Sequence, residues 1–412
     1  MQDKINLNGI SAEELVRKYG SPLYVYNGDL IRQRYREVVS SIKYPKTRML
    51  YACKANTNPE IMKILLEEGC GIDAVSYGEV LLALNTGFKP ENILFTGNNI
   101  DDEEMKKVIS KKIMVNIDSI SQLERYGQLI PGSKISVRIN PDVGAGHHNH
   151  VVTGGPDSKF GIYYNRAEEI KKIVIKYNLK VTGLHMHVGS RFLDSKPFLK
   201  AMETLLEIAE QFKELDFIDF GGGLGVPYSP DENSIDLKDF GEQVSNLFSN
   251  WCNRYGREIE MVFENGRYYV AEAGHLLVRV NTIKSTPKFK FAGVDSGFNH
   301  LIRPTMYGSY HKIVNLSNTE GEKEKIVVAG NLCESGDVFT RNEQESVPRE
   351  LPKIREGDIL SIENAGAYGF SMSSNYNLRL KPAEVLITGK NIRLIRRRET
   401  YEDIFRSLEK QQ

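Results

Sequence analysis

The feature that most constrains the fold is a regular alternation of short apolar runs with longer segments of helical period. Helix-like stretches lie between most of the apolar runs, for example at 59–68, 78–85, 101–110 and 166–177. The runs of strand length are 48–54, 71–76, 92–97, 113–118, 135–140, 181–189, 216–221 and 260–265. Eight such units in series favour a closed parallel (β/α)8 TIM-like barrel, with a doubly wound open sheet as the alternative.

After Gly274 the pattern changes to strand-like runs with few helices between them, which predicts an all-β second domain. These runs are 275–283, 290–295, 325–329, 358–363 and 383–387, and 392–408 reads as a strand that leads into a surface helix. The early run PLYVY (22–26) could pair with this domain. We therefore predict a barrel over 27–274 and a β-rich domain made of 1–26 and 275–412.

The composition of the 412 residues is that of a globular protein, with 40% hydrophobic and 26% charged residues. Basic and acidic residues balance at 54 each, so no net charge favours binding to nucleic acid or to a membrane surface. No apolar run approaches the roughly 20 residues that span a bilayer. The four cysteines are scattered without zinc-binding spacing, which predicts a reducing cytoplasm.

Chemically active residue types gather where the eight predicted strands end. In a barrel these carboxyl ends meet at one face, which carries the active site. The residues concerned are Lys54, Asp73, Ser76, Arg138, Asn140, His185, His187, Ser190, Gly221, Gly222, Gly223, Glu264, Gly266 and Arg267. Their collection at strand ends predicts a functional site at the mouth of the barrel.

Lys54 ends the first strand, just before a helix start within Asn56–Pro59. A lysine at such an edge can be a solvated charge, and spacing alone favours that reading. The other reading is a lysine that forms a Schiff base with a carbonyl compound.

A glycine cluster, Gly221–Gly225, follows the seventh strand. Glycine lets backbone N–H groups approach an anion closely, although a tight turn needs the same residues. Glu264-Asn265-Gly266-Arg267 follows the next strand, and the loops after strands seven and eight of a barrel often bind phosphate. Together they indicate a bound phosphate ester.

The pair His185 and His187 raises the question of a metal site. Because strand side chains alternate between faces, we expect only one of the two to face the barrel mouth, either stacked on a flat ring or as a core histidine. A second group, His147, His148 and His150, lies in a glycine-containing loop and is expected to be solvated. We predict no metal.

A Schiff-base lysine, a phosphate-binding loop, a stacking residue and a carboxylate together describe a site for pyridoxal phosphate. The carboxylate would keep the pyridine nitrogen of that cofactor protonated.

Several longer motifs carry a resemblance that covers almost the whole chain. They are YACKAN, SVRINP, TGGPDSKFG, HMHVGS, DFGGGLGVPY, ENGR, VDSGFNHLIRPTMYGSYH, CESGDVF and GAYGFSMSSNYN. With them the sequence resembles the fold type III, alanine-racemase-like pyridoxal-phosphate decarboxylases, and among these the diaminopimelate decarboxylases. The resemblance implies decarboxylation of meso-2,6-diaminopimelate to L-lysine and CO2, the last step of lysine biosynthesis.

The resemblance also implies roles for individual residues toward the cofactor. Lys54 would carry it, with Asp73 in the same site; His187 would stack on its ring. Arg138 would lie near its 3-hydroxyl group, and Glu264 would pair with its ring nitrogen. The phosphate would be held by Ser190, Gly221, Gly222, Gly223, Gly266, Arg267 and Tyr368.

For the substrate, the resemblance implies that Cys333 returns a proton to Cα, with Lys54 as a possible contributor. A free thiol is mostly protonated near neutral pH and can act as such a donor. The distal carboxylate would bind Arg303 and Tyr307, and the distal ammonium would bind Glu334. Arg267 and Tyr368 would also reach the substrate, and Asp337 would order its loop.

This sequence departs from the family pattern at two positions, where Asn265 and Asn331 replace the usual prolines. The resemblance further implies a homodimer with shared active sites, the CESGD loop reaching the cofactor of the neighbouring subunit. Two alternatives stay open. One is a related decarboxylase of ornithine, lysine or carboxynorspermidine, and the other is an inactive homologue that only binds a partner.

Overall fold

A computed structural model describes residues 7–143 and 155–408 and divides the chain into two compact units. The barrel unit comprises Arg32–Val226 and Asn233–Tyr268, and the β unit comprises Met1–Ile31, Pro227–Glu232 and Tyr269–Gln412. The division therefore lies a few residues from the expected positions 27 and 274, and 227–232 groups with the β unit.

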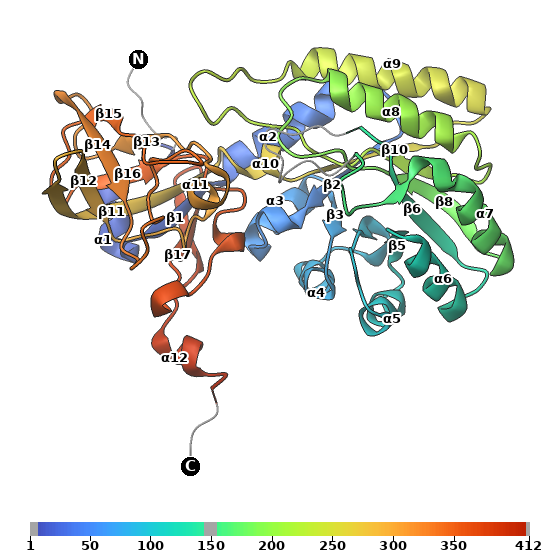
Figure 1. The fold of residues 1–412 in the computed structure, drawn as a ribbon, viewed down its shortest axis with the longest axis horizontal. Helices are drawn as coiled ribbons and strands as arrows, with labels where there is room; N and C mark the ends of the chain where they lie inside the picture. Colours follow the sequence, from blue (N-terminus) through green and yellow to red (C-terminus); the bar gives the residue numbers. More distant parts are fainter. Residues whose placement is uncertain (1–6, 144–154, 409–412) are drawn as a thin grey trace. The chain divides into compact units, whose positions relative to one another are not determined.

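The barrel unit is a closed ring of eight parallel strands (Figure 1). In spatial order they are β5 (Met114–Ile117), β4 (Ile93–Phe95), β3 (Gly71–Ala74), β2 (Thr47–Ala52), β10 (Glu260–Asn265), β9 (Phe217–Asp219), β8 (Lys180–His185) and β6 (Lys134–Asn140). Pairing of β5 with β6 closes the ring, and the short β7 (Ile162–Tyr163) adds to β6 from outside. The predicted barrel is confirmed, and the open sheet is excluded because the two ends of the sheet are joined.

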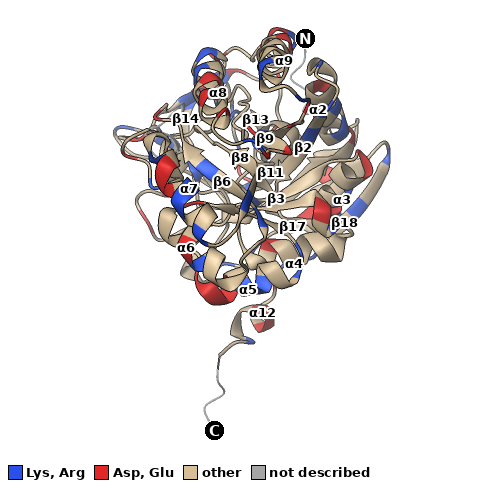
Figure 2. Cartoon of the chain, turned by 90° about the vertical axis from the view of Figure 1, so that its right-hand side faces the viewer, with Lys and Arg blue, Asp and Glu red and all other residues tan. Residues whose placement is uncertain are grey.

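Helices connect and surround these strands, as the sequence rhythm predicted. They are α2 (Gly28–Ser41), α3 (Pro59–Glu67), α4 (Tyr77–Thr86), α5 (Asp102–Ser110), α6 (Ile120–Leu129), α7 (Ala167–Lys176), α8 (Lys196–Ala209), α9 (Leu237–Tyr255) and α10 (Arg267–Val270). Polar side chains begin several of them; Asn58, for example, caps α3 by accepting from the N–H of Glu60. Figure 2 shows basic and acidic residues interspersed over the outer helices.

The barrel interior changes from apolar to polar within one layer of side chains. Leu50, Leu94, Phe217 and Val262 form an apolar cluster at the amino-terminal level. Residues two further along a strand point to the same face. At that next level the inward side chains are Asp73, Thr96, Asn116, Asp219 and Glu264, all buried. This polar layer lies directly above the apolar cluster, which we call the apolar floor.

An aromatic cluster holds α8 and α9 against the barrel. Trp251, the only tryptophan of the chain, is fully buried and stacks on Phe248 and Tyr255. Its indole N–H donates to the carbonyl of Leu206 on α8, at 2.9 Å. Trp251 is therefore a fluorescent reporter of packing in the barrel unit.

The β unit is built on a second sheet of nine strands (Figure 1). They are β1 (Leu23–Asn27), β11 (Gly274–Ser285), β12 (Lys290–Val294), β13 (Ile313–Asn315), β14 (Lys323–Ala329), β15 (Arg349–Pro352), β16 (Ile359–Ile362), β17 (Ala383–Thr388) and β18 (Asn391–Arg396). β1 pairs antiparallel with β11 and parallel with β17, which confirms the predicted pairing of PLYVY with this region. Three short helices complete the unit: α1 (Ala12–Tyr19), α11 (Arg303–Tyr307) and α12 (Tyr401–Phe405). Among the described residues, no helix combines the length and apolar character needed to cross a membrane.

The close approach of α9 to α2 yields a stability prediction. A Cβ added at Gly241 would lie 2.2 Å from the backbone oxygen of Ser41, whereas one at Gly78 would meet nothing closer than 3.7 Å. We expect Gly241→Ala to destabilise the barrel unit by about 1–3 kcal/mol, because one helix must move. Gly78→Ala should be neutral or stabilising by up to about 1 kcal/mol. Urea unfolding followed by Trp251 fluorescence measures both, and equal midpoints would contradict the packing argument.

Candidate functional site

The Lys54 amine is held by a buried carboxylate. Strand β2 ends at Ala52, slightly earlier than predicted, and Lys54 lies in a 3-10 turn over Cys53–Ala55. Its Nζ lies 2.7 Å from Oδ2 of Asp73, whose side chain is 0% exposed while that of Lys54 is 38% exposed. Burial, and next Glu264, raise the pKa of Asp73, and Lys54 partly offsets this. Lys54 is therefore a paired amine that stays partly accessible to solvent.

Arg138 is fixed from two sides. Its guanidinium lies 3.5 Å from Oδ1 of Asp118 and 4.5 Å from the ring centre of Phe160. Asp118 also accepts the N–H of Gly161, at 3.1 Å, so the same carboxylate ties down the following loop. Burial lowers the pKa of Arg138, and Asp118 is the largest opposing influence. Sequence reasoning missed Asp118 and Phe160, although Asp118 was the last residue of a predicted strand.

Both histidines of the HMHVGS motif lie inside the barrel unit near Glu264. Nε2 of His185 is 3.1 Å from Oε2 of Glu264, and Nδ1 of His187 accepts the N–H of Gly222 at 3.2 Å. The expectation that only one could face the mouth was wrong, because residues two apart on a strand share a face. Burial, and next Arg138, hold the pKa of His187 well below its usual range, so its ring is neutral at neutral pH. His147, His148 and His150 lie outside the described residues.

The glycine cluster lets three loop segments approach one another closely. Gly221 and Gly223 have φ values of +68° and +117°, which side chains rarely adopt. A Cβ at Gly222 would lie 1.8 Å from the backbone oxygen of Glu264. Nearby in the same unit, Nη2 of Arg267 donates to Oγ of Ser190 at 3.0 Å. These contacts bring most of the predicted phosphate-binding residues into one set of loops.

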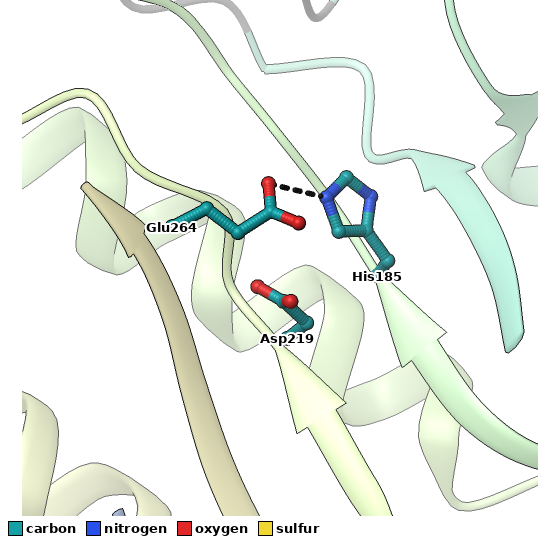
Figure 3. Close-up of side chains that lie close together, drawn as sticks. All are labelled: His185, Asp219 and Glu264. Atoms are coloured by element: carbon teal, nitrogen blue, oxygen red, sulfur yellow. Dashed lines mark hydrogen bonds and ion pairs between the residues drawn. The ribbon is translucent and has the colours of Figure 1, made fainter. Parts of the chain in front are cut away.

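Glu264 is the centre of a buried polar group at the carboxyl ends of three neighbouring strands (Figure 3). His185, Asp219 and Glu264 point toward one another, and Oγ1 of Thr96 lies 3.5 Å from Oε1 of Glu264. Burial would raise the pKa of Glu264, but His185 and then Lys54 lower it to about 2. Burial and Glu264 hold the pKa of Asp219 well above its usual range. Of these two neighbouring carboxyls, Glu264 thus holds its charge more readily than Asp219.

These three side chains also have the chemistry of metal ligands. One ligand atom from each lies within 4.8 Å of the others. Imidazole and carboxylate donors suit several divalent ions. The predicted absence of a metal stays a prediction.

The remaining predicted site residues belong to the β unit. Arg303 is buried, with its guanidinium over the rings of Tyr228 and Tyr307 at 5.1 and 5.6 Å. Cys333 is exposed, and its N–H donates to Oδ1 of Asn377 at 2.8 Å.

The loop that carries Cys333 and the exposed Glu334 is ordered by Asp337. This buried carboxylate accepts the N–H groups of Leu332 and Phe298 at 2.8 and 2.7 Å, as predicted for a loop-ordering residue. Tyr368 has a φ of +56°. The predicted site residues thus form two sets, one in each unit.

Comparison with known proteins decides which family has this barrel. The family model for the pyridoxal-dependent decarboxylase, pyridoxal binding domain, matches residues 29–271. A diaminopimelate decarboxylase from Methanothermobacter thermautotrophicus is 48% identical over 410 residues, or 97% of this chain and 94% of that protein. This chain belongs to the diaminopimelate decarboxylase family.

Solved structures of the family have the same fold. The crystal structure of diaminopimelate decarboxylase from Helicobacter pylori, complexed with L-lysine, is 34% identical with a TM-score of 0.87, covering 96% of this chain and 98% of that one. A lysine/ornithine decarboxylase from Vibrio vulnificus, complexed with putrescine, is 22% identical with a TM-score of 0.78, covering 91% and 96%. The second likeness shows the shared fold alone.

The barrel of this family member fits pyridoxal phosphate by its donor set. The partly exposed amine of Lys54 lies beside a buried carboxylate, and Glu264 is an anion among buried groups. The glycine loop has no Cβ atoms that would block close approach to its backbone. These are an amine for the cofactor carbonyl, an anion for its ring nitrogen and N–H groups for its phosphate.

The crowding at Gly222 makes the glycine loop testable. We expect Gly222→Ala to weaken pyridoxal phosphate binding at least about 10-fold, because the added methyl group displaces the loop from Glu264. The dissociation constant measured by equilibrium dialysis checks this, with Gly78→Ala, whose added Cβ would meet nothing closer than 3.7 Å, as the control. Unchanged affinity in a folded Gly222→Ala protein would contradict the assigned role of the loop.

Proposed function

We propose that this chain is a diaminopimelate decarboxylase that converts meso-2,6-diaminopimelate into L-lysine and CO2 with pyridoxal phosphate. The observation that carries the proposal is the Lys54–Asp73 pair at the mouth of the barrel, together with similarity along the full chain. Bound pyridoxal phosphate supplies a conjugated cation that absorbs the electron pair left on Cα when CO2 departs.

In this proposal the barrel residues bind and orient the cofactor. Lys54 would hold the cofactor through its carbonyl group, and Asp73 would keep the amine in place. Glu264 faces the ring nitrogen as an anion, and the neutral ring of His187 stacks on the cofactor without adding a positive charge. Arg138 sits at the 3-hydroxyl group. Ser190, Gly221, Gly222, Gly223, Gly266, Arg267 and Tyr368 hold the phosphate.

The β-unit residues recognise the substrate. Arg303 offers a planar fork that matches a carboxylate, and the rings of Tyr228 and Tyr307 restrict its orientation. Glu334 pairs with the distal ammonium group. The Cys333 thiol donates its proton to Cα after CO2 has left, which gives Cα the hydrogen that it carries in lysine.

Arg303 separates the proposed substrate from ornithine, lysine or carboxynorspermidine. A substrate without a distal carboxylate would leave the buried guanidinium without its anion. We expect CO2 release from diaminopimelate in a substrate panel. Arg303→Gln should lose about 100-fold in kcat/KM, which corresponds to roughly 3 kcal/mol for an unpaired partner. Arg393→Gln, an exposed arginine of the same unit, is the control. Release from ornithine with none from diaminopimelate would overturn the substrate assignment.

We also propose that the enzyme is a homodimer with shared active sites, as the family resemblance implies. The exposure of Cys333 and Glu334 supports this, because a loop that serves a neighbouring subunit must be accessible in the single chain. The two sets of site residues would then meet across the dimer. We further propose a cytoplasmic location, supported by four free thiols.

Subunit mixing tests the shared site. Lys54→Ala and Cys333→Ala proteins should each be nearly inactive alone. Their equimolar mixture should regain up to roughly a quarter of wild-type activity, since half of randomly paired dimers are hybrids with one intact site. Each variant taken through the same exchange protocol alone is the control. No recovery after exchange has been verified by mass spectrometry would rule out shared sites.

A further inference from the structure

His185 lies beside Glu264 but has no task in the function proposed above. We propose that His185 is a positioning residue that orients the Glu264 carboxylate and keeps it an anion for the ring nitrogen of the cofactor. This inference rests on the proposed pyridoxal phosphate site and adds to it the residue that controls its electrostatic anchor. His187, two residues later, contacts the glycine loop instead, so the two histidines have different tasks.

The contact spans the barrel interior. His185 lies on β8 and Glu264 on β10, with β9 between them, so the side chains meet above the end of an intervening strand (Figure 3). Nε2 of His185 lies 3.1 Å from Oε2, and Oγ1 of Thr96 on the opposite side lies 3.5 Å from Oε1. Both carboxylate oxygens therefore have a neighbour that restricts rotation of the group.

Packing alone does not account for a histidine at this position. The ring is 0% exposed, and among the described residues its Nδ1 has no hydrogen-bond partner. A buried polar atom without a partner lowers stability, a cost that a leucine of similar size would avoid. Among the residues that the structure describes, the polar contact of the ring is the one between Nε2 and Glu264. The stabilising polar interaction of the imidazole is therefore the one with that carboxylate.

The charges around the contact explain what the imidazole does. Glu264 also interacts electrostatically with Asp219, Lys54, Arg138, Asp73 and His187. Two adjacent carboxyls in a buried site cannot both be charged at low cost. A donor at Nε2 stabilises the anion on Glu264 rather than on Asp219, which has the raised pKa. The 3.1 Å contact of His185 thus favours the charge on Glu264.

Two amide variants separate positioning from packing. The amide nitrogen of glutamine reaches the place of Nε2, whereas that of asparagine reaches only the place of Nδ1. We expect His185→Gln to keep the ring nitrogen of bound cofactor protonated, with cofactor affinity within about threefold of wild type. His185→Asn should lose that protonation, bind the cofactor about 10-fold more weakly and lower kcat about 10- to 100-fold with KM changed less than about threefold.

The direct measurement is the 15N chemical shift of pyridoxal phosphate labelled at its ring nitrogen and bound to each holoenzyme. Trp251 fluorescence in urea checks that each variant is folded, and His185→Leu replaces His185→Asn if the latter is not. A protonated nitrogen and unchanged affinity in folded His185→Asn or His185→Leu would overturn the inference while leaving the proposed function intact. Wild-type protein that binds no cofactor would instead overturn the proposed function and this inference with it. Stoichiometric metal in the isolated wild-type protein, lost in the His185 variants, would overturn the positioning role in favour of a metal site.

Discussion

The ion pair between Lys54 and Asp73 is the interaction around which the barrel interior is arranged. A charge taken out of water is tolerated only when a partner and hydrogen bonds compensate it. The interior meets this condition repeatedly: Lys54 has Asp73, Arg138 has Asp118, and Glu264 has His185. Each pair joins residues from different strand ends. The closed ring is what brings such partners within reach of one another.

The apolar floor makes this polar layer possible. Leu50, Leu94, Phe217 and Val262 supply the barrel with a dry core one level below the charges. Side chains two residues further along the same strands can then be polar without exposing the core to water. Catalytic chemistry and structural stability thus occupy successive levels of the same strands. Loops such as 221–223, which we propose to bind the cofactor phosphate, follow the strands without changing either level.

Most of the fold could be predicted from the sequence, because strand and helix periods are local properties. All eight barrel strands lie within or beside their predicted ranges, yet several are shorter, since the predicted ranges run past the last ladder hydrogen bond, as at 53–54 after β2. The site was predicted residue by residue where a motif carried it. The interaction partners of these residues were not predicted. Asp118, Phe160 and Asp219 matter through contacts with other strands and loops of the barrel, which no linear spacing encodes. The orientation of His185 was predicted wrongly because two residues that are two positions apart on a strand were assigned to opposite faces, although the motif itself was recognised.

The polar layer leaves the barrel with polar groups that its own residues do not satisfy. Among the described residues, buried atoms of Asn116, Ser136, His185 and Asp219 have no hydrogen-bond partner. Such groups lower stability, and they cluster where function requires polarity rather than where folding does. A cofactor that binds only the folded barrel restores part of that stability by mass action. The polar groups that lower the stability of the barrel without ligand therefore make its stability depend on ligand binding.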